Sequence, residues 1–179
     1  MSLAYRVLYA IGFTPWEQMA RSPFIGRQIG ELFDREEEVR DAPFGAVLDL
    51  GCGSGIWAVE LARRGWEVTG VDAVPKALRR ARERASEAAG VHPRFVQADV
   101  TELPDAEVGS GFRLFLDFGC FHDELTDDQR RAESGEATRL AEPGASLLMM
   151  AWAPGRRGPL PRGASREDIA AAFLGMGDR

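Results

Sequence analysis

Three glycines at every second position form the stretch most suited to chemistry. Gly51, Gly53 and Gly55 follow an apolar run, Ala46–Leu50, that contains a single acid, Asp49. Glycine tolerates positive φ and leaves the backbone open to close approach, so this turn is typical of a site where a ligand touches the main chain. A carboxylate buried in an apolar segment is costly unless donors or a cation lie nearby. Asp49 therefore points to a ligand as well.

Two further acids follow later apolar runs. Asp72 lies 19 residues after Gly53, where a carboxylate can accept hydrogen bonds from both hydroxyls of a ribose. Asp99 and Val100 offer an acid and a backbone N–H to an adenine edge. Each acid alone has a simpler interpretation, because an aspartate after a strand often caps the next helix. Their occurrence together, in register with one βαβ pattern, favours a nucleoside-containing ligand.

The elements that would position these residues alternate along the chain. Apolar runs separated by helical patterns predict strands at Ala46–Leu50, Glu67–Val71, Arg94–Gln97, Phe112–Phe118 and Ala145–Trp152. Strands and helices that alternate in this way predict an α/β fold, a parallel sheet with helices on both faces. In such sheets ligands bind at the carboxyl ends of the strands, near the point where the strand order reverses, and the glycine turn should lie there.

The first residues predict a helical lead-in. Thr14 and Glu17 have the spacing of a capping box, and Pro23 follows a second N-cap candidate. We interpret residues 1–45 as a lead-in or lid, with Tyr9 and Trp16 closing the site, although two helices simply packed onto the sheet would give the same pattern. Residues 46–179 then form the ligand-binding α/β part. A chain of 179 residues suits a single domain overall.

Bulk composition disfavours several classes of function. The formal net charge of -6 argues against a nucleic-acid partner bound by bulk electrostatics. With 2 cysteines and 2 histidines the chain has neither a disulfide framework nor a metal-ligand spacing. No signal pattern and no apolar run of membrane length occur, so we expect a cytoplasmic protein that does not enter the membrane. The bias toward arginine, alanine and glycine is typical of a GC-rich bacterial genome.

Four stretches resemble the motifs of class I S-adenosylmethionine-dependent methyltransferases. They are the first motif (Val47–Gly55), the ribose-binding acid (Gly70–Asp72), the adenine-contacting motif (Gln97–Val100) and the strand-four motif (Leu116–Gly119). The resemblance implies a Rossmann-like, doubly wound, mostly parallel sheet and methyl transfer from S-adenosyl-L-methionine to a small-molecule acceptor. The lead-in residues Thr14-Pro15-Trp16 and the stretch Gly119-Cys120-Phe121-His122 resemble the small-molecule branch, which includes tellurite-resistance and thiopurine methyltransferase-like proteins.

The resemblance also implies a donor site. Its cofactor-binding candidates are Asp49, Gly51, Cys52, Gly53, Asp72, Ala73, Asp99, Val100, Asp117 and Trp16. The donor methyl group should face the space beyond the fourth strand, where Asp117 and His122 are the catalytic candidates and His122 is the candidate base. A histidine that packs or caps before the helix at Thr126 is the simpler alternative. Phe118 and Phe121 would line the pocket, although Phe121 could equally belong to the core.

The glycine turn itself disfavours two other ligands. The dinucleotide fingerprint has a glycine at its sixth position, where this chain has Ile56. Asp49 suits the ammonium and sulfonium groups of S-adenosylmethionine better than a pyrophosphate, and no GxxxxGK[ST] nucleotide motif occurs. A module that binds the donor without turnover remains an alternative, and an NAD-dependent oxidoreductase is a less favoured one.

The C-terminal part departs from the family pattern. Class I methyltransferases usually end with further strands, one of them antiparallel, whereas these strands are missing after the helix that opens at Ser165. The fifth strand would then be an open apolar edge, which predicts either a shortened chain or a homodimer through that edge. Arg156, Arg157 and Arg162 follow this strand and are candidates to clamp an acidic acceptor, unless their loop is simply solvated.

Overall fold

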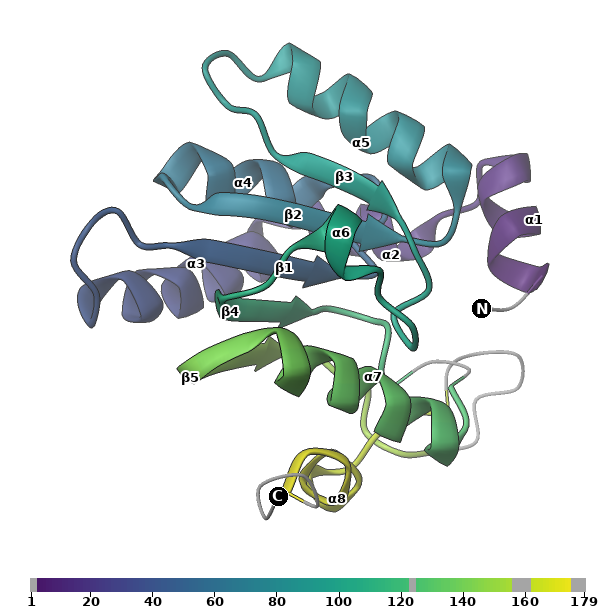
Figure 1. Cartoon of the computed structure of the whole chain (residues 1–179). Coiled ribbons are helices and arrows are strands. Elements are labelled where there is room, and N and C mark those ends of the chain that lie inside the picture. The colour runs from purple at the N-terminus through teal and green to yellow at the C-terminus, as the bar shows by residue number, and fades with distance from the viewer. Residues whose placement is uncertain (1–2, 123–124, 156–161, 175–179) are drawn as a thin grey trace.

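The computed structural model describes residues 3–122, 125–155 and 162–174 (Figure 1). Its centre is a 5-stranded sheet in the order β3-β2-β1-β4-β5, and every pairing is parallel. The strands are β1 (Ala46–Leu50), β2 (Glu67–Asp72), β3 (Arg94–Gln97), β4 (Phe112–Asp117) and β5 (Ala141–Met149). The predicted doubly wound α/β fold is confirmed, and among the described residues the sheet contains no antiparallel strand.

Helices cover both faces of this sheet. They are α1 (Leu3–Ile11), α2 (Pro15–Ala20), α3 (Pro23–Glu38), α4 (Ile56–Arg64), α5 (Pro75–Glu87), α6 (Asp105–Val108), α7 (Asp127–Leu140) and α8 (Arg166–Leu174). α6 and α7 lie in front of the sheet in Figure 1, and α3 and α4 lie behind it. Of the helices in the described part of the chain, none combines the length and apolarity needed to cross a bilayer.

β1 is apolar because both of its faces are covered. Val47 packs in a cluster with Phe33 of α3 and Leu61 of α4, whereas Leu48 packs on the opposite face with Leu140 of α7. All five side chains are fully buried. A strand buried on both faces reads as a nearly continuous apolar run, which makes the one acid in β1, Asp49, exceptional.

β5 differs from the prediction at both ends. It begins at Ala141 and ends at Met149, short of Trp152. Its pairing with β4 passes from Ala141 directly to Ser146, so Pro143 lies in a bulge within the strand. Proline has no N–H for the ladder and is tolerated at bulges and sheet edges. As predicted, β5 lies at the edge of the sheet.

The helical lead-in is confirmed, but one of its capping signals was wrong. Thr14 occupies the N-cap of α2 without any capping hydrogen bond from its side chain. Glu17, the expected partner, is 7 % exposed and lies 3.9 Å from Arg80 of α5. The equivalent signal at Thr126 does form a capping box with Gln129 at the start of α7.

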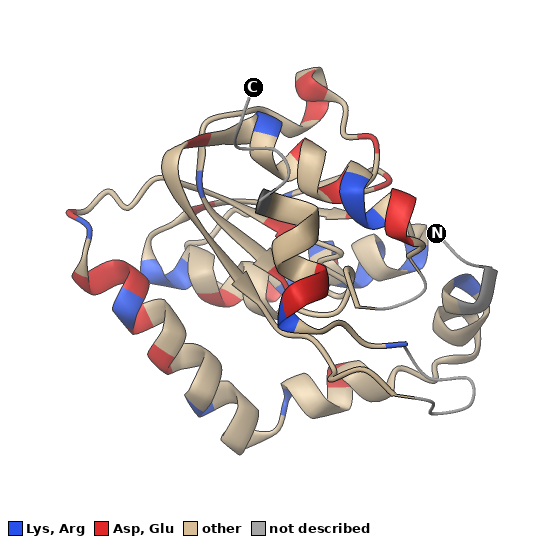
Figure 2. Cartoon of the chain, turned by 90° about the horizontal axis from the view of Figure 1, so that it is seen from below, with Lys and Arg blue, Asp and Glu red and all other residues tan. Residues whose placement is uncertain are grey.

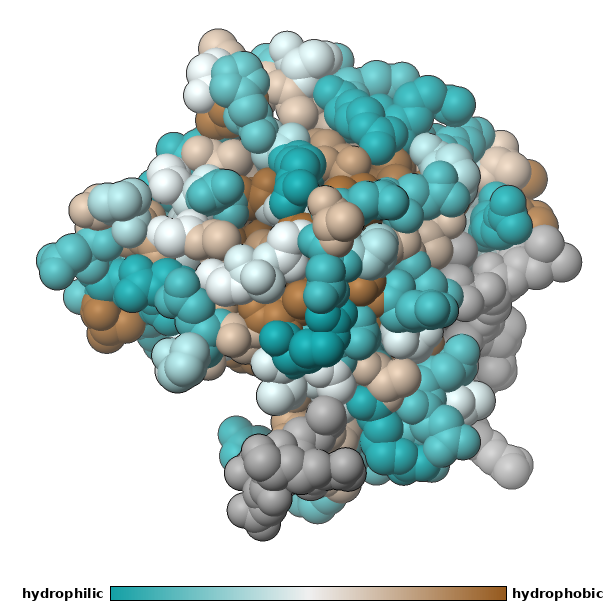
Figure 3. All heavy atoms as spheres, in the orientation of Figure 1, coloured by the Kyte–Doolittle hydropathy of each residue, from teal (hydrophilic) through white to brown (hydrophobic). Residues whose placement is uncertain are grey.

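Charge gathers on the outer helices. Figure 2 shows acidic and basic segments interspersed along these helices, while the central strands are mostly uncharged. In Figure 3 hydrophilic side chains cover most of the visible face, and hydrophobic ones show between them near its centre. This distribution is that of amphipathic helices packed on a sheet.

Candidate active site

The glycine turn after β1 adopts the predicted conformation. Gly51, Gly53 and Gly55 have φ of 66°, 54° and 69°, a region that L side chains rarely adopt. A Cβ on Gly53 would lie 2.9 Å from the hydroxyl oxygen of Tyr9, and one on Gly51 would lie 3.2 Å from Cβ of Cys120. The turn therefore needs glycine both for its φ angles and for the groups that approach it.

Asp72 fixes this turn to the end of β2. Its Oδ2 accepts a hydrogen bond from the Gly53 N–H at 2.9 Å, and its Oδ1 accepts one from the Val74 N–H at 2.7 Å. Burial raises the pKa of Asp72, although both backbone donors act in the opposite direction. Ala73, between the two contacts, is half-buried. Because each carboxylate oxygen has further acceptor capacity, Asp72 can still accept hydroxyl groups.

Asp49 is a buried acid with one unsatisfied oxygen. It is 3 % exposed, and its Oδ2 has no hydrogen-bond partner among the described residues. Burial raises the pKa of Asp49 to about 8, and the nearby charges of Asp72 and Asp117 add to this effect. The three acids lie on neighbouring strands around the sheet's switch point. A cation at this position would favour the ionised form of Asp49.

Asp99 and Val100 lie beside this edge as predicted. Asp99 Oδ1 accepts hydrogen bonds from the backbone N–H and the hydroxyl of Thr101, at 3.1 and 2.7 Å. Partial burial acts to raise the pKa of Asp99, but these hydrogen bonds outweigh it and the pKa is lowered. Val100 is buried in the core between the sheet and α7. An ionised acid is thus held in a fixed orientation.

Asp117 ends β4 and holds the turn that follows at residues 118–122, the β4 turn. Its Oδ1 accepts hydrogen bonds from the backbone N–H groups of Gly119 (3.1 Å) and Cys120 (2.7 Å), and its Oδ2 accepts one from Phe121 (2.9 Å). Asp117 is 1 % exposed. These contacts make Asp117 the anchor of this turn. None of them suggests a catalytic role for Asp117, which therefore stays a prediction.

His122 lies at the end of the same turn. It is 5 % exposed, its Cε1 would be 3.8 Å from a Cβ on Gly119, and its carbonyl oxygen accepts a hydrogen bond from Gly163. Cys120, two residues earlier, contacts Gly51 of the glycine turn at residues 51–55, the donor turn. The structure therefore brings the β4 turn against the glycine turn, with His122 buried behind it.

The two phenylalanines of this region pack against the core. Phe118 packs against Phe33 and Trp57, with ring centroids 6.5 and 5.9 Å away. Phe121 is fully buried, and its ring lies 6.1 Å from that of Phe173 in α8. The expectation that both rings line an open pocket was wrong for Phe121, and the core alternative is confirmed.

The lead-in covers the glycine turn. Trp16 donates a hydrogen bond from Nε1 to the hydroxyl of Tyr9 at 3.2 Å, and Tyr9 packs on Val74 and Ala77 of the β2–α5 segment. Tyr9 is 2 % exposed. Trp16 thus reaches the site through Tyr9, whose hydroxyl faces Gly53.

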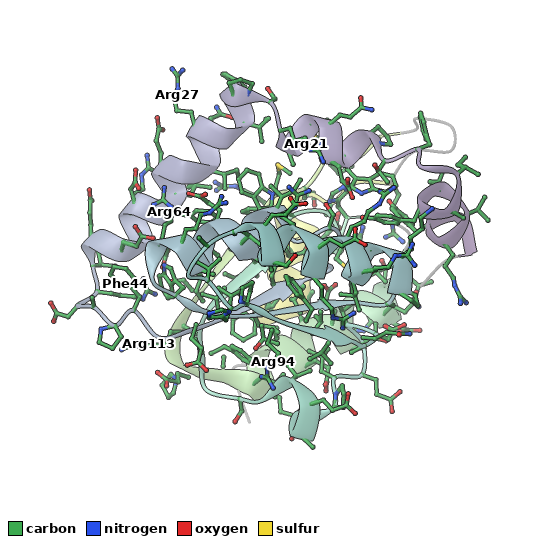
Figure 4. All side chains as sticks on the ribbon, turned by 90° about the horizontal axis from the view of Figure 1, so that it is seen from above. Arg21, Arg27, Phe44, Arg64, Arg94 and Arg113 are labelled. Atoms are coloured by element: carbon green, nitrogen blue, oxygen red, sulfur yellow. The ribbon has the colours of Figure 1, made fainter. Side chains whose placement is uncertain are left out.

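Two surface clefts lie away from this edge. Clefts of about 450 and 540 Å³ run between the α2–α3 junction and the outer faces of α4 and α5, and Arg21, Arg84 and Glu87 line both. Figure 4 shows Arg21 near the α2–α3 junction. Arg84 donates from Nε to the Ser54 carbonyl at 2.8 Å, so the clefts adjoin the back of the donor turn. Arginine and glutamate side chains line much of both clefts, with Phe33 and Trp57 also lining the larger one. The buried acids that call for a ligand lie at the strand ends instead.

Two of the three loop arginines proposed as an acceptor clamp, Arg156 and Arg157, lie outside the described residues. Arg162 forms an ion pair with Asp127 at 2.6 Å. The first residues of α7 thus hold its side chain, and a role in binding an acceptor stays a prediction.

Sequence reasoning missed Glu133 of α7. It is 1 % exposed, and the nearby charges of Asp117 and Arg130 act on its pKa in opposite directions. A signal was available, because Arg130, Glu133 and Ser134 share the face of α7 that ends in the apolar Ala137 and Leu140. Charged residues at helical spacing on a core-facing stripe indicate a buried polar network.

The sheet order, the glycine turn and the acids at the strand ends define the class of protein. The methyltransferase domain family matches residues 47–144, and the chain belongs to this family. That match covers the span from β1 to the bulge in β5.

Curated relatives share parts of the chain. A 2-heptyl-1-hydroxyquinolin-4(1H)-one methyltransferase from Mycobacteroides abscessus is 30% identical over 156 residues, which cover 84% of this chain and 66% of that protein. A ubiquinone biosynthesis O-methyltransferase from Albidiferax ferrireducens is 44% identical over 64 residues, or 36% of this chain and 25% of that protein. The chain thus spans less than two thirds of the length of these relatives.

Solved structures confirm the fold. An N-methyltransferase, NodS, from Bradyrhizobium japonicum in complex with S-adenosyl-l-homocysteine gives a TM-score of 0.70 at 19% identity, covering 88% of this chain and 77% of its own. A TehB-like SAM-dependent methyltransferase from Corynebacterium glutamicum gives 0.68 at 20% identity, covering 97% and 83%. At these identities the likeness shows the fold alone.

Proposed function

We propose that this protein transfers the methyl group of S-adenosyl-L-methionine to a small-molecule acceptor. One observation carries the proposal: Asp49 is buried behind a bare glycine turn at the sheet's switch point, with an oxygen that has no partner among the described residues. Such a carboxylate fits a cationic ligand. Membership of the methyltransferase domain family and the quinolone and ubiquinone methyltransferase relatives support the same reaction.

Each predicted donor contact has a role in this proposal. Asp49 faces the positive charge, and the backbone of Gly51, Cys52 and Gly53 lies against the methionine part. The remaining contacts serve the nucleoside: Asp72 and Ala73 at the ribose, Asp99 and Val100 at the adenine, Asp117 through the turn that it anchors, and Trp16 through Tyr9. When bound, the donor supplies an activated methyl group on a sulfonium.

Transfer is an in-line displacement. The acceptor's lone pair forms the new bond to carbon, the carbon–sulfur bond breaks, and its electron pair returns to sulfur, which becomes a neutral thioether. The protein contributes positioning, and a base is needed only if the acceptor must lose a proton. His122 is the proposed base for that case. Because His122 is buried, the acceptor must approach it beside the β4 turn.

Two alternatives make different predictions. A module that binds the donor without turnover should bind S-adenosylmethionine and yield no methylated product when screened against small-molecule extracts by mass spectrometry. An NAD-dependent oxidoreductase should bind nicotinamide cofactor in an Asp72-dependent way. Isothermal calorimetry with S-adenosylmethionine, S-adenosylhomocysteine and NAD separates these cases, and failure of both adenosine ligands to bind would overturn the proposal.

We also propose that residues 1–45 act as a lid and that β5 pairs with a second copy. The lid proposal is supported by the contact between Tyr9 and the donor turn. The dimer is supported by the position of β5 at the sheet edge, where Leu147, Leu148 and Met149 are only partly buried. Light scattering tests the dimer, and a monomeric mass at all concentrations contradicts it.

A further inference from the structure

A buried acid on α7 faces the anchor of the β4 turn. Glu133 is 1 % exposed, and no hydrogen bond from a described donor reaches its Oε1 or Oε2. Its carboxyl group faces the carboxylate of Asp117 and the side chain of Cys120. Two adjacent buried carboxylates cannot both be ionised without a large cost.

The hydrogen bonds around Asp117 indicate which acid keeps its charge. A carboxylate offers about four acceptor positions, and backbone N–H groups of Gly119, Cys120 and Phe121 take three of those on Asp117. These donors favour the ionised form of Asp117, and the remaining position is on Oδ2. Glu133 has no comparable set of backbone donors among the described residues.

We propose that Glu133 is protonated and donates a hydrogen bond to the ionised carboxylate of Asp117, and that Glu133 thereby positions the β4 turn against the donor turn. The proton satisfies the fourth acceptor position of Asp117 and removes the second negative charge. This hydrogen bond affects the donor turn through Cys120, because the Cβ of Cys120 lies 3.2 Å from the position that a Cβ on Gly51 would occupy.

The electrostatics support this assignment. Burial raises the pKa of Glu133 well above its ordinary value, with Asp117 as the next cause, while Cys120 and Arg130 act in the opposite direction. The guanidinium of Arg130 instead donates hydrogen bonds to the carbonyl oxygens of Phe121 (2.9 Å) and Gly163 (2.7 Å). The charge of Asp117 therefore faces a neutral acid.

The test compares two substitutions of similar size. Glu133→Gln keeps a donor for Asp117, whereas Glu133→Met keeps the volume and removes the donor. Ser134→Ala is the matched control, since Ser134 is the next residue on α7 and its hydroxyl donates to Ala172 of α8 at 2.8 Å. Affinity for S-adenosylhomocysteine is measured by calorimetry, and folding is checked by circular dichroism.

This inference rests on the proposed function for its binding readout. We expect Glu133→Gln and Ser134→Ala to bind close to the wild-type affinity and Glu133→Met to bind about tenfold more weakly or worse, because a buried acceptor is left without a donor. Equal loss in both Glu133 variants, or no loss in either, would overturn the positioning role.

A second measurement covers the case in which Glu133→Met does not fold. The infrared difference spectrum between the wild-type protein and Glu133→Gln at neutral pH should show the carbonyl stretch of a protonated carboxyl group that the variant lacks. An ionised carboxylate signal in its place would overturn the inference. This readout needs no donor, so it separates failure of the inference from failure of the proposed function.

Discussion

The hydroxyl oxygen of Tyr9 lies 2.9 Å from the point that a Cβ on Gly53 would occupy. Tyr9 is buried and holds the indole N–H of Trp16, so its ring cannot turn away freely. The lead-in therefore contacts the donor turn at a single residue of that turn, Gly53.

Gly53→Ala should weaken donor binding and destabilise the fold. The φ of 54° is unfavourable for alanine and the new methyl group would meet Tyr9, so we expect a loss of about 1 kcal/mol or more. Thermal unfolding and calorimetry measure the two effects. Gly65→Ala is the control: its φ is 101° but no atom lies within 4 Å of the new Cβ, so only stability should fall.

Tyr9→Phe should partly rescue Gly53→Ala. The substitution removes the hydroxyl group that meets the new methyl group, although it also leaves the Trp16 N–H without its acceptor, at a cost of about 1 kcal/mol. A double-mutant cycle on thermal stability measures the coupling, which should be favourable by about 0.5 kcal/mol or more for residues in contact. Strict additivity would show that the two residues do not touch.

Asp49→Asn should change how stability depends on pH. The pKa of Asp49 is about 8 in the folded protein and 3.8 as its ordinary value, so the folded state binds the extra proton between these pH values. Wild-type stability therefore falls as pH rises from about 4 to 8, by up to roughly 1.4 kcal/mol per pH unit from this group.

In the Asp49→Asn protein that contribution is absent. Its stability relative to the wild type should therefore increase as pH rises, as measured by urea unfolding. Asp99→Asn provides the contrast. Its lowered pKa contributes stability that is present at neutral pH and lost as pH falls through the folded pKa. An unchanged slope in Asp49→Asn would contradict the raised pKa.

Asp72→Ala should lower both stability and donor affinity. It leaves the N–H groups of Gly53 and Val74 without their acceptor, and an unsatisfied buried donor costs about 1–3 kcal/mol. Asp72→Asn keeps one acceptor oxygen and should fall between the two proteins. Chemical unfolding gives the stability and calorimetry gives the affinity. Donor binding that survives Asp72→Ala unchanged would remove the proposed ribose contact.

The donor turn could be predicted from the sequence because its signals are local. The spacing of Gly51 and Gly53, the lone acid Asp49 and the apolar strands around them each act over a few residues. The same holds for Asp72, whose place at the end of β2 follows from the strand that precedes it.

The remaining features depend on packing between distant segments. Nothing near Tyr9 in the sequence indicates that it meets Gly53, and the pairing of Glu133 with Asp117 requires the position of α7 on the sheet. The bulge at Pro143 depends on its register with β4. Phe121 was ambiguous because an aromatic residue after a strand suits a pocket and a core equally well.

Proton release on donor binding tests the central claim most directly. At pH 7, calorimetry with S-adenosylmethionine in buffers of different ionisation enthalpy should show release of about one proton, because the cation ionises Asp49. Asp49→Asn should bind about tenfold more weakly or worse and release none. Donor binding that is equal in the two proteins, or that moves no proton in the wild type, would contradict the assignment of Asp49 as the acid that recognises the cation.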